Sequence, residues 1–199
     1  MNNKRRSSIA AILLGFVVVL LLGVPPHASG SAQDSPRAAL TPPPPPVDAN
    51  GIALAGSWHG PYTFRNFNSG KCLDILGAST KDGAPAVQYT CAPFGRSQTW
   101  WLWQMPGGSQ HSFNLFMNDY SGKCIMPYTG SRGAEVRQYP CYEYEIMTWA
   151  NTINDPNLYY NYGTGFAMEV NGASKANFAR VLQWTKHGRA HQIWLRYNA

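Results

Sequence analysis

Charged residues are scarce in this chain of 199 residues, which has 16 Lys and Arg against 10 Asp and Glu. Four of the bases and two of the acids precede residue 57, so 12 bases and 8 acids remain in the rest of the chain, and the bases form no run. A nucleic-acid-binding protein concentrates positive charge on one face or stripe. The sequence therefore predicts no nucleic-acid partner.

Catalytic motifs are also missing from the sequence. There is no Gly-x-Ser-x-Gly elbow and no phosphate-binding glycine loop with a lysine. A glycosidase needs two convergent carboxylates, but only Glu143 and Glu145 are close in sequence, in alternation with tyrosines. His187 and His191 are four residues apart, but a turn containing Gly188 separates them, whereas a helix would place them on one face. The sequence predicts no enzyme, no metal site and no cofactor.

Helical periodicity is absent after Gly51, where no stretch carries apolar residues at helical spacing over three turns. Short alternating segments such as residues 62–66 and 158–162 are instead separated by Gly, Ser, Asn and Asp. Alternating segments between such residues are typical of strands and turns. We therefore expect an all-β fold.

The amino terminus has the three regions of a signal peptide in the required order. Basic residues at 4–6 precede an apolar run over 9–22, and small residues follow at 28–32. The run is shorter than the ~20 residues of a typical membrane-spanning helix, although an uncleaved anchor remains the alternative. We expect residues 1–32 to be a signal peptide cleaved at about residues 31–33, which predicts a secreted protein without stable membrane insertion after cleavage.

A proline-rich segment follows the expected signal peptide. Residues 33–56 include five consecutive prolines at 42–46, which supply no backbone donors. Such a run favours an extended polyproline spacer. We expect a disordered linker over 33–56 and one folded domain over 57–199.

Three stretches of the folded region resemble one another. The first and third keep a constant offset of 95 residues from Gly70, which aligns with Gly165, onward to Cys91, which aligns with Lys186. The copies end on Gln98-Thr99-Trp100, Met147-Thr148-Trp149 and Gln192-Ile193-Trp194. A few strands cannot bury an apolar face alone, so the three copies must associate. The closing tryptophans should then be buried where the copies meet.

The repeated motifs resemble those of a known lectin family. A Gly-Lys-Cys-Leu-Asp segment at 70–74, an aromatic residue before a second Cys and a closing Gln-x-Trp resemble the ricin B-chain lectins and the family 13 carbohydrate-binding modules. The resemblance covers roughly residues 62–196. It implies a β-trefoil of twelve strands in three lobes, each with a shallow potential sugar pocket.

The resemblance also implies site residues. In this family an acid after the first Cys position accepts hydrogen bonds from sugar hydroxyls, and an aromatic residue before the second Cys position stacks on the ring, which suits the polar edges and the apolar face of a pyranose. Carried over, the carbohydrate-binding residues are Asp74, Tyr89 and Gln98 in lobe one and Glu169, Trp184 and Gln192 in lobe three. Lobe two has Met126 and Met147 in place of the acid and the amide, which leaves only Tyr139. We expect lobe two not to bind.

Lobes one and three depart from the family pattern at two positions each. The family usually has Asn before the closing Gln, where this chain has Ser97 and His191. A further amide two residues before the aromatic residue is replaced by Val87 and Leu182. The closing glutamines also have a structural part in the family, so a structural and a binding role both stay open for them.

The four cysteines are expected to form disulfides, because an exported chain enters an oxidising compartment. Four cysteines allow three connectivities. The repeat selects Cys72 with Cys91 and Cys124 with Cys141, and the third copy lacks both members of the pair.

Two non-enzymatic functions are compatible with these observations. One is binding to a glycan or polysaccharide, and the other is a protein-interaction or inhibitor scaffold on the same fold. Kunitz-type protease inhibitors share the β-trefoil without the Gln-x-Trp repeat. The repeat therefore favours the carbohydrate-binding function.

Overall fold

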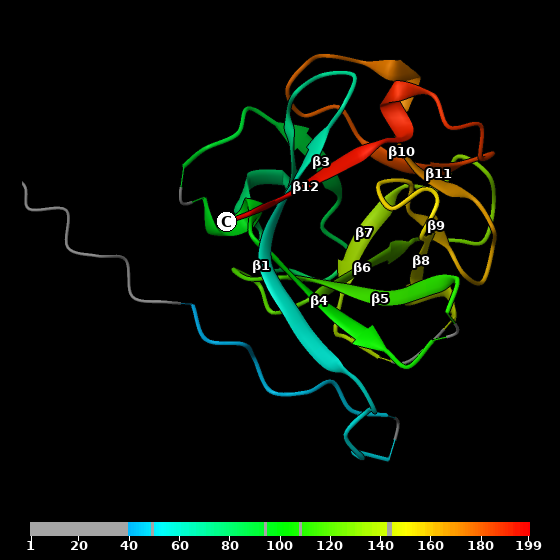
Figure 1. The fold of residues 1–199 in the computed structure, drawn as a ribbon. Coiled ribbons are helices and arrows are strands. Elements are labelled where there is room, and N and C mark those ends of the chain that lie inside the picture. The colour runs from blue at the N-terminus through cyan, green and yellow to red at the C-terminus, as the bar shows by residue number, and fades with distance from the viewer. Residues whose placement is uncertain (1–39, 49, 94, 108, 143–144) are drawn as a thin grey trace, which may run out of the picture. The chain divides into compact units, whose positions relative to one another are not determined.

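The computed structural model of the chain describes residues 40–199 except 49, 94, 108, 143 and 144 (Figure 1). The expected signal peptide and its cleavage site lie outside the described residues. Within the described part of the chain, no helix is both long enough and apolar enough to cross a membrane.

The described residues form twelve strands and five short 3-10 helices. The strands are β1 (Ser57–Asn66), β2 (Cys72–Ile75), β3 (Ala86–Tyr89), β4 (Trp100–Met105), β5 (His111–Asn118), β6 (Cys124–Pro127), β7 (Val136–Tyr139), β8 (Trp149–Thr152), β9 (Tyr160–Asn161), β10 (Ala167–Val170), β11 (Val181–Trp184) and β12 (Trp194–Asn198). The 3-10 helices are η1 (Leu76–Ala78), η2 (Arg96–Gln98), η3 (Glu145–Met147), η4 (Asn171–Ala173) and η5 (Ala190–Gln192).

The strands pair as a β-trefoil, which confirms the expected fold. Strands β12, β1, β4, β5, β8 and β9 pair in succession, and a bridge between Leu158 and Ile193 links the two ends of this series. The other six strands form three hairpins, β2–β3, β6–β7 and β10–β11. Figure 1 shows β12 beside β1, so the last strand of the chain lies next to the first.

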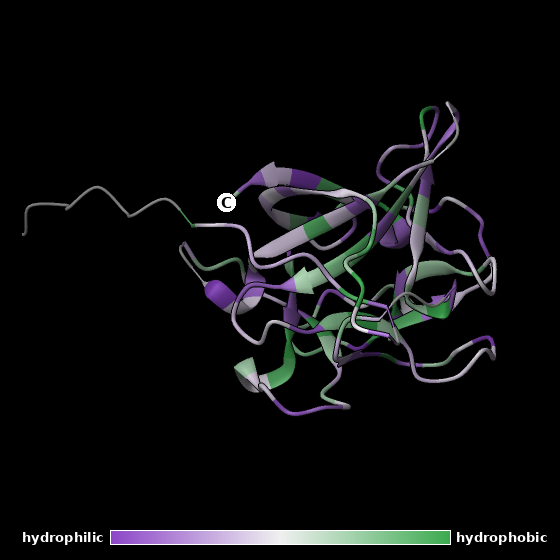
Figure 2. Ribbon diagram, turned by 90° about the horizontal axis from the view of Figure 1, so that it is seen from below, coloured by the Kyte–Doolittle hydropathy of each residue, from purple (hydrophilic) through white to green (hydrophobic). Residues whose placement is uncertain are grey.

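Each hairpin has one face in the core and one face outward, because successive side chains of a strand point to opposite sides. In β2, Leu73 and Ile75 belong to the central hydrophobic cluster. Asp74 alternates with them and therefore points outward, on the face that carries the candidate site. Figure 2 shows the hydropathy of the residues changing along the strands.

The closing tryptophans Trp100, Trp149 and Trp194 are fully buried in one hydrophobic cluster, as predicted. Their indole N–H groups donate to the backbone carbonyls of Leu73, Ile125 and Met168, at 3.1, 2.9 and 3.1 Å. A buried indole is stabilised when its N–H has a partner. Each tryptophan therefore fixes the hairpin of its own lobe to the core.

Three buried glutamines join each lobe to the next. The side-chain amide of Gln138 in lobe two donates to Ser79 and Lys81 carbonyls of lobe one, at 2.7 and 3.0 Å. Gln183 of lobe three donates in the same way to two carbonyls of lobe two, and Gln88 of lobe one to two carbonyls of lobe three. All three glutamines are fully buried. The links form a closed cycle around the three lobes.

Both predicted disulfides are present. Cys72 is bonded to Cys91 and Cys124 to Cys141. Each bond ties the first strand of a hairpin to the residues that follow the second strand. The β10–β11 hairpin of lobe three forms without a disulfide.

Part of the expected linker packs on the trefoil. Leu40, Leu54 and Trp58 contact a hydrophobic cluster centred on lobe two, and the Trp58 indole N–H donates to the Pro44 carbonyl at 3.3 Å. The described residues 40–48 and 50–56 therefore differ from the free spacer that the prolines favour. The physical reason is that the segment carries apolar side chains that gain by leaving water.

Candidate functional site

The lobe-three candidates lie together at an open pocket of about 440 Å³. Glu169 in β10 and Trp184 in β11 are on the same outward face of their hairpin, since Glu169 pairs with Leu182, and Trp184 pairs with Ala167. The residues lining the pocket are Glu169, Asn171, Gly172, Trp184, His187, Arg189 and His191. The pocket thus combines a carboxylate, an indole and two imidazoles.

Glu169 lines this pocket and is 5% exposed. Its Oε2 atom accepts a hydrogen bond from Gln192 Nε2 at 2.7 Å and lies 3.2 Å from His187 Nε2 and 3.6 Å from His191 Nε2. The structure therefore brings together two predicted site residues and two histidines that were not expected to act together.

Gln192 connects Glu169 to the turn that carries His187 through hydrogen bonds. It is fully buried, and its Oε1 accepts hydrogen bonds from the backbone N–H groups of His187 and Gly188 at 3.0 and 3.1 Å. Its Nε2 donates to the Thr185 carbonyl as well as to Glu169. Both polar atoms of the Gln192 amide are thus occupied by hydrogen bonds inside the protein, which favours a structural part for this residue.

The two histidines approach each other through the turn and η5. The chain reverses at Gly188, whose φ of +68° is in the left-handed region that favours glycine. His191 then lies in η5, and the two ring centroids are 5.1 Å apart. Burial lowers the pKa of His191, and the Glu169 carboxylate partly opposes this shift.

Trp184 is partly covered by lobe two. The Arg132 guanidinium carbon lies 4.9 Å from a ring centroid of Trp184, which is a cation–π distance. A Cβ atom at Gly133 would lie 3.1 Å from the indole, so the ring packs directly on that glycine. These contacts fix the orientation of the ring, while Trp184 still lines the pocket.

Lobe one repeats the acid and amide of lobe three. Asp74 Oδ2 accepts a hydrogen bond from Gln98 Nε2 at 2.8 Å, and its Oδ1 accepts one from the Ile75 N–H at 2.7 Å. Gln98 is 2% exposed and also contacts the backbone of Thr90 and Ala92. Gln98 thus contacts Asp74 as Gln192 contacts Glu169.

Tyr89, the aromatic candidate of lobe one, packs against Phe178 of lobe three, with ring centroids 4.8 Å apart. Phe178 is 55% exposed and has a φ of +65°. Lobes one and two have Gly83 and Gly133 at the equivalent position, also with positive φ. Phe178 is thus an exposed aromatic residue in a left-handed backbone conformation, which is unfavourable for a bulky non-glycine residue. In the sequence, this residue could have been found as a Phe at a position where the other two repeats have Gly.

Lobe two has a different composition at the equivalent position. Met126, Tyr139 and Met147 pack in a hydrophobic cluster with Trp101 and Trp103. The backbone N–H of Tyr142 contacts the Met147 sulfur at 3.2 Å. Prolines 43–46 line an adjacent pocket of about 420 Å³ together with Cys141. Apolar side chains therefore occupy the position where the other lobes have an acid.

The four departures from the family pattern have structural counterparts. Val87 and Leu182 are buried and form isolated bridges to Arg180 and Glu135 of neighbouring lobes. The backbone carbonyls of Ser97 and His191 accept hydrogen bonds from Asn118 and Asn66 side chains at 2.7 and 3.0 Å. The imidazole of His191 lies close to the Glu169 carboxylate.

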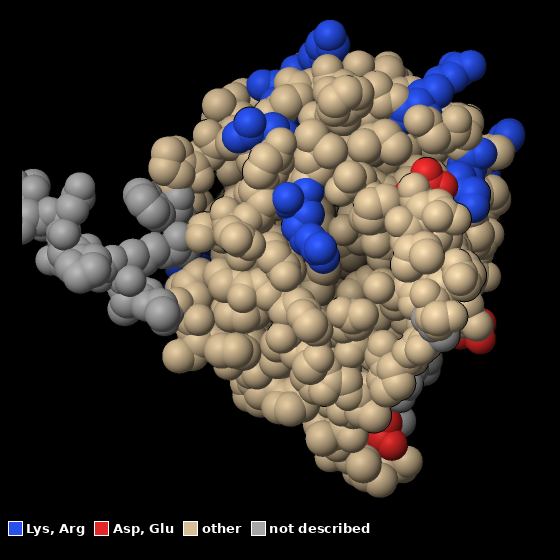
Figure 3. All heavy atoms as spheres, in the orientation of Figure 1, with Lys and Arg blue, Asp and Glu red and all other residues tan. Residues whose placement is uncertain are grey.

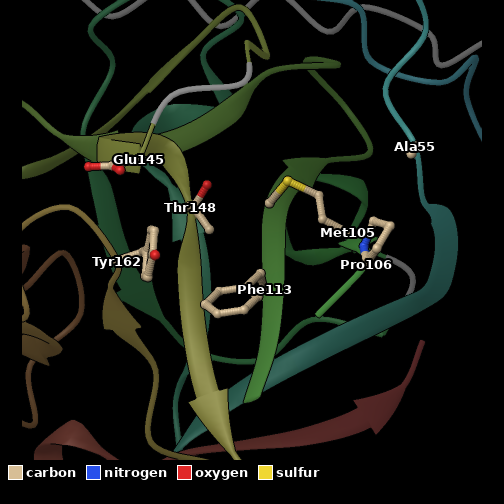
Figure 4. Close-up of a pocket in the computed structure, with 7 residues that line it drawn as sticks. All are labelled: Ala55, Met105, Pro106, Phe113, Glu145, Thr148 and Tyr162. Atoms are coloured by element: carbon tan, nitrogen blue, oxygen red, sulfur yellow. The ribbon is translucent and has the colours of Figure 1, made fainter. Parts of the chain in front are cut away.

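A separate pocket of about 470 Å³ contains none of the predicted site residues (Figure 4). Its lining residues are Ala55, Met105, Pro106, Phe113, Glu145, Thr148 and Tyr162. The Phe113 and Tyr162 rings meet edge to face with centroids 5.0 Å apart. This pocket is mainly apolar, and among the described residues that line it Glu145 is the one acid.

Surface charge is dispersed on the face shown in Figure 3, where the Lys and Arg side chains stand apart from one another between uncharged residues. Binding of a nucleic acid to this face would require a cluster of Lys and Arg side chains.

Comparisons with known proteins agree with this geometry. The model of the ricin-type beta-trefoil lectin domain matches residues 60–194. A designed three-fold symmetric protein, ThreeFoil, is 29% identical with a TM-score of 0.64, over 71% of this chain and all of that one. An exo-β-1,3-galactanase from Clostridium thermocellum is 25% identical with a TM-score of 0.64, over 75% of this chain and 32% of that one.

The agglutinin of Rhizoctonia solani shares the fold at 17% identity, with a TM-score of 0.54 over 74% of this chain and 99% of that one. Among curated protein sequences, none matches the chain. The family model covers more than half of the chain, and the strands, disulfides and closing tryptophans follow the expected trefoil pattern. The chain belongs to the ricin-type β-trefoil lectin family.

Proposed function

We propose that the protein is a secreted carbohydrate-binding protein that holds sugars in lobes one and three. The observation that carries the proposal is the pocket of lobe three, where the Glu169 carboxylate and the Trp184 indole line one open depression. A carboxylate accepts hydrogen bonds from vicinal hydroxyls, and an indole face packs on the apolar face of a pyranose. The lectin domain match supports this assignment.

Lobe one supports a second, similar site. Asp74 points outward from β2, and its carboxylate keeps an unused lone pair on each oxygen after the two internal hydrogen bonds. Tyr89 and Phe178 together offer an aromatic surface beside it. Lobe two has no acid at the equivalent position, so its Tyr139 lacks a polar partner.

A glycan array with the purified mature protein tests the proposal directly. Binding to one class of glycan, lost in an Asp74→Asn, Glu169→Gln double variant that still folds, is the expected result. An array without any bound glycan, combined with specific capture of a secreted protein, would instead support the interaction-scaffold function.

Secretion has its own test. We expect protein recovered from culture medium to begin at about residues 31–33, because the basic, apolar and small-residue regions stand in the order of a cleaved signal. Amino-terminal sequencing measures this. Recovery only from the membrane fraction with Met1 retained would contradict it.

Replacing Phe178 by Gly should weaken sugar binding at lobe one without lowering stability. Gly adopts positive φ freely, whereas an L-residue in the left-handed region costs roughly 1–2 kcal/mol, and the half-exposed Phe178 ring gives up little burial. Calorimetric titration with the best array ligand and a thermal melt measure both effects. A lower Tm with unchanged affinity would show that Phe178 only supports the fold.

A further inference from the structure

We propose that Glu169, His187 and His191 form a binding site for a divalent transition metal ion, with Zn²⁺ as the ion that suits these ligands best. One ligand atom from each of the three residues lies within 4.8 Å of the other two. Imidazole nitrogens and a carboxylate oxygen are the usual non-sulfur ligands of Zn²⁺ in proteins. The proposal does not depend on sugar binding, since it rests on the imidazoles as well as on the acid.

Two of the three ligand distances fit tetrahedral coordination. With Zn–N and Zn–O bonds of about 2.0–2.2 Å, two ligand atoms of a tetrahedral site lie about 3.3 Å apart. Glu169 Oε2 lies 3.2 Å from His187 Nε2 and 3.6 Å from His191 Nε2. The two imidazole nitrogens lie within 4.8 Å of each other, so the rings must approach by up to about 1.5 Å to share one tetrahedral ion.

Further hydrogen bonds orient the proposed ligands, as is usual for metal ligands. Gln192 Nε2 donates to the Glu169 carboxylate at 2.7 Å, which fixes the position of that acid. Gln192 Oε1 accepts hydrogen bonds from the backbone of His187 and Gly188, which fixes the turn that carries the first imidazole. One buried glutamine thus orients the acid and one histidine.

The proposed ligand atom of His187 already has two polar neighbours. His187 Nε2 lies 3.2 Å from Glu169 Oε2 and 3.2 Å from Gln192 Nε2, and the Nδ1 atom of the same ring accepts a hydrogen bond from the Arg189 N–H at 3.2 Å. A metal ion at Nε2 requires the lone pair of that atom, so the proton of the neutral ring would be on Nδ1. The Arg189 N–H would then bond to water instead, since it is exposed.

All three proposed ligands line the open pocket. Three protein ligands with one open position leave room for a water molecule or another oxygen ligand, as in zinc sites that bind exogenous ligands. Arg189 and Trp184 line the same pocket. Arg189 is exposed, so solvent screens its repulsion of the ion.

The test is a titration of the chelator-treated mature protein with ZnCl₂ by calorimetry, followed by Co²⁺ substitution with visible absorption to detect four-coordinate geometry. We expect one Zn²⁺ per chain. His187→Ala and His191→Ala should each weaken binding at least about 10-fold, because even outer-shell changes cost about 10- to 100-fold. His111→Ala, at an exposed histidine on β5, is the matched control and should bind like the wild type.

Two further variants keep the metal and sugar proposals apart. Trp184→Ala should lose sugar binding at lobe three and keep the Zn²⁺ affinity, since it provides no ligand atom, whereas His187→Ala should lose Zn²⁺. Circular dichroism confirms that each variant is folded. Absence of Zn²⁺ binding, or binding that folded His187→Ala and His191→Ala both retain, would overturn the metal site and leave the three residues as a hydrogen-bonded cluster.

Discussion

Replacing Trp184 by Ala is expected to weaken binding to a polymeric glycan by about 100-fold or more, with a much smaller effect on binding of a free monosaccharide to the whole protein. Two shallow sites that engage one polymer raise avidity by about 10²- to 10⁴-fold over a single site. Loss of the lobe-three platform removes this gain, while lobe one still binds one monosaccharide. Surface plasmon resonance on immobilised polysaccharide and calorimetry with the free sugar measure the two quantities.

Matched variants show which lobes contribute. Asp74→Asn keeps the shape of the lobe-one acid and should give the same loss on the polymer, whereas Tyr139→Ala in lobe two should bind like the wild type. Thermal melts check folding, because Tyr139 packs on the lobe-two cluster. If folded Tyr139→Ala lost binding while the other two variants kept it, the assignment of the lobes would be wrong.

Replacing Gln138 by Ala is expected to reduce the free energy of unfolding by about 3 kcal/mol or more, because unpaired buried polar groups cost about 1–3 kcal/mol each. The side chain is fully buried, donates to the Ser79 and Lys81 carbonyls and accepts a hydrogen bond from the Ser121 hydroxyl at 2.7 Å. Its removal leaves these groups without their partner and opens a cavity between two lobes.

Chemical denaturation and thermal melts measure this loss, which corresponds to a decrease in Tm of roughly 10 °C for a domain of this size. Gln110→Ala removes an exposed amide and serves as the control. An unchanged denaturation midpoint for Gln138→Ala would mean that the links between lobes contribute little to stability.

The repeat predicted most of the fold, because a repeated motif specifies one supersecondary unit and the way in which copies associate. The burial of Trp100, Trp149 and Trp194 followed from their place at the end of each copy. The disulfide pairing followed from the matching positions of the two cysteine pairs in the first and second copies, and the third copy supported it by lacking both members. These features depend on the pattern of the whole chain, which the sequence displays.

The contacts between loops could not be predicted in this way. A turn at Gly188 and the 3-10 helix η5 bring His187 and His191 close to Glu169. The spacing of these residues in the sequence does not predict the conformation of such a turn. Phe178 reaches Tyr89 from another lobe, so the contact depends on the three-dimensional arrangement of the copies. The packing of Leu40 and Leu54 depends on an apolar cluster that forms only in the folded domain.

The cyclic links between lobes make the folded structure largely independent of the point at which the chain begins. Each lobe has a neighbour on both sides, and β12 pairs with β1, so the start and end of the trefoil lie side by side. The Ala199 N–H even donates to the Pro61 carbonyl at 3.1 Å. A circular permutant that begins in the exposed turn at residues 153–156, with a short linker from residue 199 to residue 57, should therefore retain the same core and the two proposed sugar pockets.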